Sequence, residues 1–310
     1  MGAPAPFPIQ PDLTAIALEY RNRRMIADQV MPRVPVAKQD FKYLVHTLAD
    51  GFTIPDTKVG RRAAPNQVEF SATEQTSSTV DYALDDSVPN EDIENAPQNY
   101  NPVNKAAEYI TALLELDREQ RVASAVFNAS NYAAANKSTL SGTTQWSDFT
   151  NSNPIGAIMT ALDACVMRPN IMVLGRAVYT QLVQHPKIIK AWLGNAGDAG
   201  VANASALANL FELDAVLVGE SFVNSAKKGQ ATSLARVWGK YCALLYRDSV
   251  ATASRGTTFG FTAQFGTRIA GSFEDKDVGM RGGLRVRVGE SVKEVVTATD
   301  LGYLFSAAVA

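Results

Sequence analysis

The chain has 310 residues, of which 46% are hydrophobic, and its charge is almost balanced, with 29 basic against 31 acidic side chains. This composition can bury the core of two modest domains or of one extended, subdivided domain. The charge balance provides no basic surface for gripping nucleic acid, so contact with a genome would be weak and non-specific. No apolar run approaches the roughly 20 residues that span a bilayer, and the N-terminus lacks a secretory signal.

The first 40 residues predict an arm without a core of its own. Residues 1–11 contain four prolines and should be extended or flexible. Helical spacing begins at Asp12, a suitable N-cap, and the helix should end before Met31-Pro32, because the residue ahead of a proline disfavours helical dihedrals. Residues 31–40 then predict extended chain. Such an arm must lie on another surface, for example on a neighbouring subunit.

Residues 41–80 predict a long two-stranded hairpin with its tip near Gly60, Arg61 and Arg62. An isolated hairpin of this length is marginal in water, so it should gain stability from a partner. A run of acidic residues follows and is interpreted as a solvated loop. Its members are Asp81, Asp85, Asp86, Glu91, Asp92 and Glu94.

Residues 101–128 predict the clearest helix of the chain, here called the spine helix. Asn101 can cap its start, Pro102 suits the first helical position, and apolar residues recur every three or four positions. At 1.5 Å per residue the helix would be roughly 40 Å long. That is well above the usual length in a globular protein.

From residue 154 onward the pattern is that of a compact α/β subdomain, followed by β structure. Short apolar runs alternate with helical segments, which favours a layered arrangement. Expected helices are 154–166, 177–184 and 205–211, and expected strands are 171–175, 215–219 and 235–247. In the last fifty residues, Leu284, Val286 and Val288 alternate with Arg285 and Arg287. Strand pairs crossed by a long helix would make an α+β domain.

Chemistry-bearing motifs are scarce. Cys165 and Cys242 stand far apart in apolar surroundings and should be buried, reduced thiols. His46 and His185 lie apart from any cysteine or acidic cluster, which argues against a zinc or Cys–His site. The sequence has no phosphate-binding loop, nucleophile elbow or His-Glu-x-x-His motif. No catalytic residue, metal ligand or cofactor is therefore predicted.

The order of these elements resembles that of tailed-bacteriophage major capsid proteins with the HK97-type fold. The phrases MIADQVMPRVPVAKQDFKY, STLSGTTQWSDFTNSNPIGAI and GYLFSAAV carry the resemblance, which extends over essentially the whole chain. It implies an HK97-like α+β capsid fold with an N-terminal arm, an extended β-hairpin loop, a peripheral domain and an axial α/β domain. It also implies a subunit that assembles into pentamers and hexamers of an icosahedral shell around double-stranded DNA.

The resemblance further implies domain boundaries and partners. The arm would be 1–40, the extended loop 41–97, the peripheral domain 98–139 with 262–298, and the axial domain 140–261 with 299–310. Some members of the family carry a scaffold-like segment ahead of the arm. Here the arm begins almost at Met1, so we expect that segment to be cleaved off or supplied by a separate scaffolding protein. A portal and a decoration protein are further expected partners, and the protein would be made in the host cytoplasm and reside in the virion.

Two contacts between subunits can be hypothesised. Opposite charge favours pairing of Arg61 and Arg62 with acidic residues of a neighbour within 81–94. Lys58, near the hairpin tip, is a candidate for the isopeptide cross-link known in one branch of the family, although no accompanying signature is present. Denaturing gels of particles distinguish ladders from a single monomer band.

Other functions stay open at this stage. An encapsulin-like shell of a bacterial compartment would have the same fold, and particle contents would separate packaged protein from genome DNA. An enzyme with an α/β core would need a concave site with converging polar groups, which the sequence does not reveal. A tail-tube or decoration subunit is usually shorter and lacks a spine helix.

Overall fold

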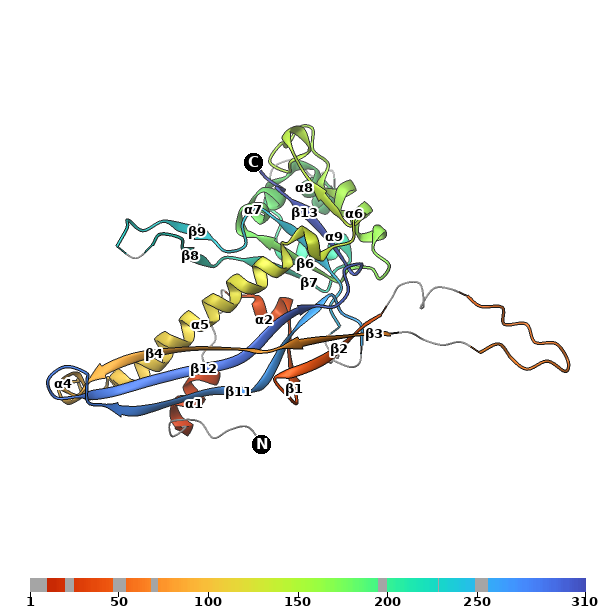
Figure 1. The fold of residues 1–310 in the computed structure, drawn as a ribbon. Coiled ribbons are helices and arrows are strands. Elements are labelled where there is room, and N and C mark those ends of the chain that lie inside the picture. The colour runs from red at the N-terminus through yellow and green to blue at the C-terminus, as the bar shows by residue number, and fades with distance from the viewer. Residues whose placement is uncertain are drawn as a thin grey trace.

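The computed structural model describes most of the chain, and Figure 1 shows an elongated molecule built along one long helix. The described residues are 10–19, 25–46, 54–67, 72–194, 200–227, 229–248 and 256–310. The long helix is α5 (Pro102–Val126), which confirms the predicted spine helix. Its start is fixed as expected, because the Asn101 side chain accepts hydrogen bonds from the backbone N–H groups of Val103 and Asn104.

A four-stranded sheet lies against α5, in the order β1-β11-β12-β4. Strands β11 (Gly260–Asp275), β12 (Gly283–Val296) and β4 (Val80–Pro89) run antiparallel, and β1 (Arg33–Val36) pairs in parallel with β11. Val286 and Val288 are fully buried on the helix side, as their alternation predicted. The acidic run was wrongly interpreted as a loop, since it forms β4 and the short helix α4 (Asn90–Glu94).

The described part of the arm lies on its own chain. Helix α1 (Pro11–Glu19) buries Leu13 and Ala17 in the cluster formed by α5 and the sheet. Helix α2 (Ala27–Val30) packs against α5, and β1 joins the sheet. The prediction of one helix from Asp12 to Met31 is wrong, because Met25 and Ile26 are not helical and α2 is a separate turn.

The predicted hairpin is present at its base. Strand β2 (Asp40–His46) pairs antiparallel with β3 (Ala72–Ser78), with Asp40 opposite Ser78 and His46 opposite Ala72. Between them, the described residues 54–67 are all exposed and project from the body (orange in Figure 1). A turn closes there, where the Ala63 N–H donates to the carbonyl of Gly60 at 3.0 Å.

A second, five-stranded sheet forms the core of the α/β subdomain, in the order β5-β13-β10-β6-β7. Its strands are β5 (Lys137–Thr139), β6 (Ile171–Gly175), β7 (Ala215–Gly219), β10 (Cys242–Leu245) and β13 (Gly302–Ser306). Around it lie α6 (Pro154–Ala164), α7 (Arg176–Gln184), α8 (Pro186–Leu193), α9 (Ala204–Phe211) and the short turns η1 (Ala129–Asn131) and η2 (Gly142–Thr144). The expected helices and the strands at 171–175 and 215–219 are confirmed.

The strand expected at 235–247 is divided. Strand β9 (Leu234–Arg236) pairs with β8 (Phe222–Asn224) in a separate two-stranded ribbon that projects from the subdomain (Figure 1). Gly239, at a φ of +48°, then turns the chain into β10. Both cysteines are buried and free, as predicted.

Gly219 allows the close approach on which the junction of α5 and the α/β subdomain depends. A Cβ at this position would lie 2.0 Å from the ring atoms Cγ and Cδ1 of Trp238, which is completely buried. We expect Gly219→Ala to destabilise the unassembled chain by about 1–3 kcal/mol, because the ring must move. Urea unfolding followed by tryptophan fluorescence measures the change. Gly60→Ala, which meets only ordinary contact with Ala63, is the matched control, and equal stability of the two variants would contradict the assignment.

Candidate assembly surfaces

Helix α5 carries charged side chains on its buried face, and Glu119 lies where three parts of the chain meet. Its carboxylate accepts hydrogen bonds from the N–H groups of Ile26 and Ala27, at 3.0 and 2.8 Å, at the start of α2. Nε1 of Trp238 donates at 2.6 Å and Oγ of Ser221 at 3.4 Å. Burial raises the pKa of Glu119, although these hydrogen bonds act in the opposite direction. One carboxylate thus joins the arm, α5 and the α/β subdomain.

Arg118, next to Glu119, connects the arm to the sheet. Its guanidinium donates to Asp28, to the carbonyl of Met31 at 3.2 Å and to Oγ1 of Thr262 at 3.1 Å. Burial alone would raise the pKa of Asp28, but the charges of Arg118 and Arg33 outweigh it and lower that pKa. The end of α2 is therefore held against β11.

Glu290 in β12 is enclosed by two arginines. Nη1 of Arg33 lies 2.7 Å and Nη2 of Arg268 3.1 Å from its carboxylate. Arg268 also donates to the carbonyl of Ala17 at 2.7 Å and to Glu115 at 3.3 Å. Burial alone would raise the pKa of Glu290, but the arginines lower it below its ordinary value. Glu290 and Arg268 are both buried, and each has an opposite charge as its partner, which is the condition under which such charges are tolerated.

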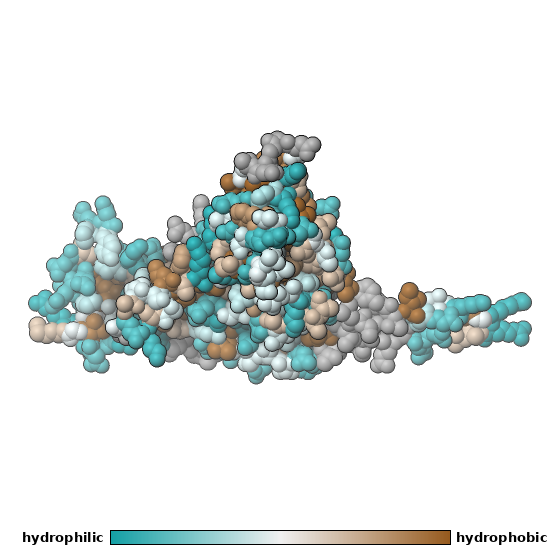
Figure 2. Space-filling view, turned by 90° about the horizontal axis from the view of Figure 1, so that it is seen from above, coloured by the Kyte–Doolittle hydropathy of each residue, from teal (hydrophilic) through white to brown (hydrophobic). Residues whose placement is uncertain are grey.

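The residues proposed for contacts at the hairpin tip are exposed. Arg61 and Arg62 lie in the projecting segment 54–67, and Lys58 lies in the same segment. Two apolar side chains accompany them, Ile54 at 88% and Val59 at 47% exposure. Figure 2 shows that this projecting end is mostly hydrophilic. The segment therefore presents cations and some apolar surface without a core beneath it.

The six predicted acidic residues fall into two groups. Three of them have partners within the chain, since Asp85 forms an ion pair with Arg287 at 2.6 Å, Glu91 one with Arg281 at 3.4 Å, and Asp81 accepts a hydrogen bond from Ser291. The other three are exposed and have no hydrogen bond or ion pair with any described residue. They are Asp86, Asp92 and Glu94. Only half of the predicted acidic residues are therefore available to pair with a neighbour, and the other half are already paired within the chain.

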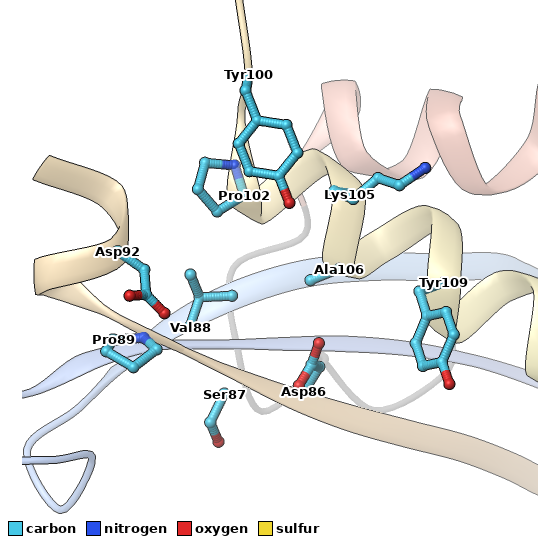
Figure 3. Close-up of a pocket in the computed structure, with 10 residues that line it drawn as sticks. All are labelled: Asp86, Ser87, Val88, Pro89, Asp92, Tyr100, Pro102, Lys105, Ala106 and Tyr109. Atoms are coloured by element: carbon cyan, nitrogen blue, oxygen red, sulfur yellow. The ribbon is translucent and has the colours of Figure 1, made fainter. Parts of the chain in front are cut away.

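Two of these free carboxylates border a cleft between the start of α5, the end of β4 and α4 (Figure 3). The cleft has a volume of about 290 Å³. Asp86 and Asp92 line it together with Tyr100 and Tyr109, which are 51% and 62% exposed. Lys105 lies on its rim and pairs with Glu108 at 3.0 Å. Sequence reasoning named the two carboxylates but missed the tyrosines, because nothing in their spacing places them beside β4.

Features that would indicate other chemistry are absent from the described residues. No group of three or more His, Cys, Asp or Glu side chains in these stretches could hold a metal ion. Among the same residues, no helix has both the length and the apolar character needed to cross a bilayer. His185 is buried and occupied, with Nε2 3.0 Å from Oγ of Ser152 and Nδ1 accepting from the Lys187 N–H. His46 belongs to β2, and its side chain lies outside the described part.

Comparison with known proteins gives this architecture a class. A family model described as phage major capsid protein E matches residues 106–229. A phage-related protein from Bordetella bronchiseptica RB50 superposes with a TM-score of 0.75 at 24% identity, covering 98% of each chain. The capsid structure of cyanophage P-SCSP1u superposes at 0.60, with 11% identity and coverage of 94% of this chain and 90% of that one. The fold is thus the HK97-like α+β fold of capsid subunits.

One relative is similar enough to define the family. The major capsid protein of Pseudomonas phage JBD67 is 58% identical over 306 residues, which cover 99% of both chains. The chain belongs to the family of phage major capsid proteins. The resemblance inferred from its sequence phrases is confirmed.

The buried ion pairs of Glu290 predict that the fold loses stability in acid. Because the folded state lowers its pKa, Glu290 stabilises the fold above its unfolded pKa of about 4.3, and this contribution is lost as the pH falls through the folded value. We expect Glu290→Gln to cost about 3 kcal/mol at pH 7 and to lose less stability than the wild type on acidification. Urea unfolding of the unassembled chain from pH 7 to pH 2 measures both effects.

A matched control is Asp163→Asn, which removes an exposed pair with Arg168. We expect it to change stability by less than about 1 kcal/mol at every pH. If the free energy of unfolding of Glu290→Gln depended on pH in the same way as that of the wild type, Glu290 would not be the source of the acid sensitivity.

Proposed function

We propose that this chain is the subunit of an icosahedral shell, arranged in pentamers and hexamers, around the double-stranded DNA of a tailed phage. The observation that carries the proposal is the projecting segment 54–67, in which every residue is exposed and which includes Ile54 and Val59. A hairpin segment that projects from the body without a core of its own would gain stability by burial against another subunit. Membership of the major capsid protein family supports the same conclusion.

The proposal includes a division of labour along the chain. The arm (1–40) and the extended loop (41–97) would make contacts between subunits through those parts that do not pack on their own chain, such as segment 54–67. The peripheral domain (98–139 with 262–298) and the axial domain (140–261 with 299–310) would form the wall. The packing of α5 against β11 and β12 supports the first of these two assignments, and the pairing of β6, β7, β10 and β13 in one sheet supports the second.

The partners in this proposal are mainly further copies of the chain. Arg61 and Arg62 would pair with acidic residues of a neighbour in the stretch from Asp81 to Glu94. A scaffolding protein and a portal would act during assembly, and a decoration protein could bind the finished shell. Contact with DNA would be non-specific, because the chain carries 29 basic against 31 acidic residues.

An encapsulin-like compartment is the competing function for the same fold. The 58% identical relative is a phage major capsid protein, which favours the phage shell. The role proposed is structural rather than enzymatic, and the cleft beside α5 is interpreted below as a surface for contact.

Electron microscopy of the purified protein tests the proposal. We expect closed icosahedral particles or sheets of hexamers, because the exposed apolar side chains of segment 54–67 are buried only on assembly. Particles isolated from infected cells should contain genome-length DNA. A stable monomer at high protein concentration would contradict the proposal, and particles filled with a single protein cargo would favour the compartment.

A further inference from the structure

Two arginines differ from all the other described arginines because they have no partner among the described residues. Every other arginine in the described stretches has a hydrogen bond, an ion pair or an aromatic contact within the chain. Arg61 and Arg62 have none of these with any described residue. A guanidinium is strongly stabilised when it meets a carboxylate in a forked geometry and an aromatic face, so two free arginines on one exposed turn are well suited to a partner.

The cleft beside the start of α5 has the complementary chemistry. Asp86 and Asp92 line it and have no partner among the described residues, whereas Asp85 is already occupied by Arg287. The exposed rings of Tyr100 and Tyr109 add aromatic faces (Figure 3). Carboxylates beside aromatic rings are the environment that a guanidinium prefers.

Two features of the cleft disfavour the binding of a cation, but neither outweighs the two free carboxylates. The start of a helix carries partial positive charge, but the Asn101 side chain already accepts from two of the N–H groups of α5. Lys105 on the rim is neutralised by its ion pair with Glu108. The two free carboxylates therefore make the cleft negatively charged.

The cleft and the hairpin tip lie at opposite ends of the molecule. Figure 1 shows the end of β4 and α4 at one end and the projecting loop at the other, with the sheet between them. Complementary surfaces at opposite ends of one chain meet only between copies, in a head-to-tail contact. Such contacts close into rings when the rotation between copies permits it.

We propose that the cleft lined by Asp86, Asp92, Tyr100 and Tyr109 receives the Arg61–Arg62 turn of the next subunit. This inference rests on the proposed shell function and narrows it to one site. It assigns the contact to Asp86 and Asp92 and excludes Asp81, Asp85 and Glu91, which have partners within the chain. A full shell would repeat the contact once per subunit around each ring.

Charge exchange in the full chain tests the site. Asp86→Asn/Asp92→Asn should raise the protein concentration needed for assembly by roughly tenfold or more, because a charged hydrogen bond is lost. Arg61→Asp/Arg62→Asp should do the same, and adding Asp86→Arg/Asp92→Arg should restore assembly. Sedimentation measures the assembled fraction, and circular dichroism with urea unfolding checks that each variant folds.

Control variants separate this site from general charge effects. Glu94→Gln removes an exposed acid of α4 outside the cleft, and Lys58→Ala removes a cation from the same loop. Both should assemble like the wild type. The inference is overturned if the asparagine variant also assembles like the wild type, or if the charge exchange fails to restore assembly while all variants fold.

Cross-linking locates the contact directly. Cys165 and Cys242 are buried, so a short bismaleimide should react only with introduced surface thiols. Particles of Arg61→Cys/Asp92→Cys should give dimers and higher bands on denaturing gels, and Arg61→Cys/Leu234→Cys should give only monomers. If wild-type particles form but Arg61→Cys/Asp92→Cys gives only monomers on the gel, the proposed contact is contradicted and the proposed shell function is not. If no particles form, the proposed function fails as well.

Discussion

The fold depends on charged side chains that α5 carries in its buried face. Glu119 caps the start of α2 and accepts a hydrogen bond from Trp238, so the arm and the α/β subdomain meet on one carboxylate. Arg118 fixes the other end of α2 against β11. Apolar burial would hold these elements together but would not fix their register, because it is non-directional. Hydrogen bonds to a buried charge are directional, and leaving one unmade is costly.

This arrangement separates the molecule into a braced body and exposed ends. The body is fixed internally by α5, the two sheets and the described part of the arm. Segment 54–67 and the ribbon of β8 and β9 project from it, and Phe222 and Leu234 of that ribbon are also exposed. The body of such a subunit is already folded before assembly. The exposed apolar side chains of its projecting parts would be covered by a partner.

The elements with strong local signals were predictable from the sequence. Asn101-Pro102 marked the start of α5, and the alternation after Gly283 marked β12. Signals that depend on tertiary context failed: Asp81 to Glu94 looked solvated by charge, yet β12 supplies a pairing strand and Arg287 a partner. Arg118 stands in the apolar stripe of α5, four residues after Leu114 and four before Val122. That position hinted at a buried charge, but not at Asp28 as its partner.

Hydrogen exchange on unassembled subunits and on assembled particles distinguishes the internally held body from the surfaces that are covered on assembly. We expect α2, β11 and β12 to be protected already in the free subunit, because the charges of α5 hold them there. Segment 54–67 should exchange freely in the subunit and become protected only in particles. Equal exchange of segment 54–67 in both states, or an unprotected α2 in the free subunit, would contradict this division between body and covered surfaces.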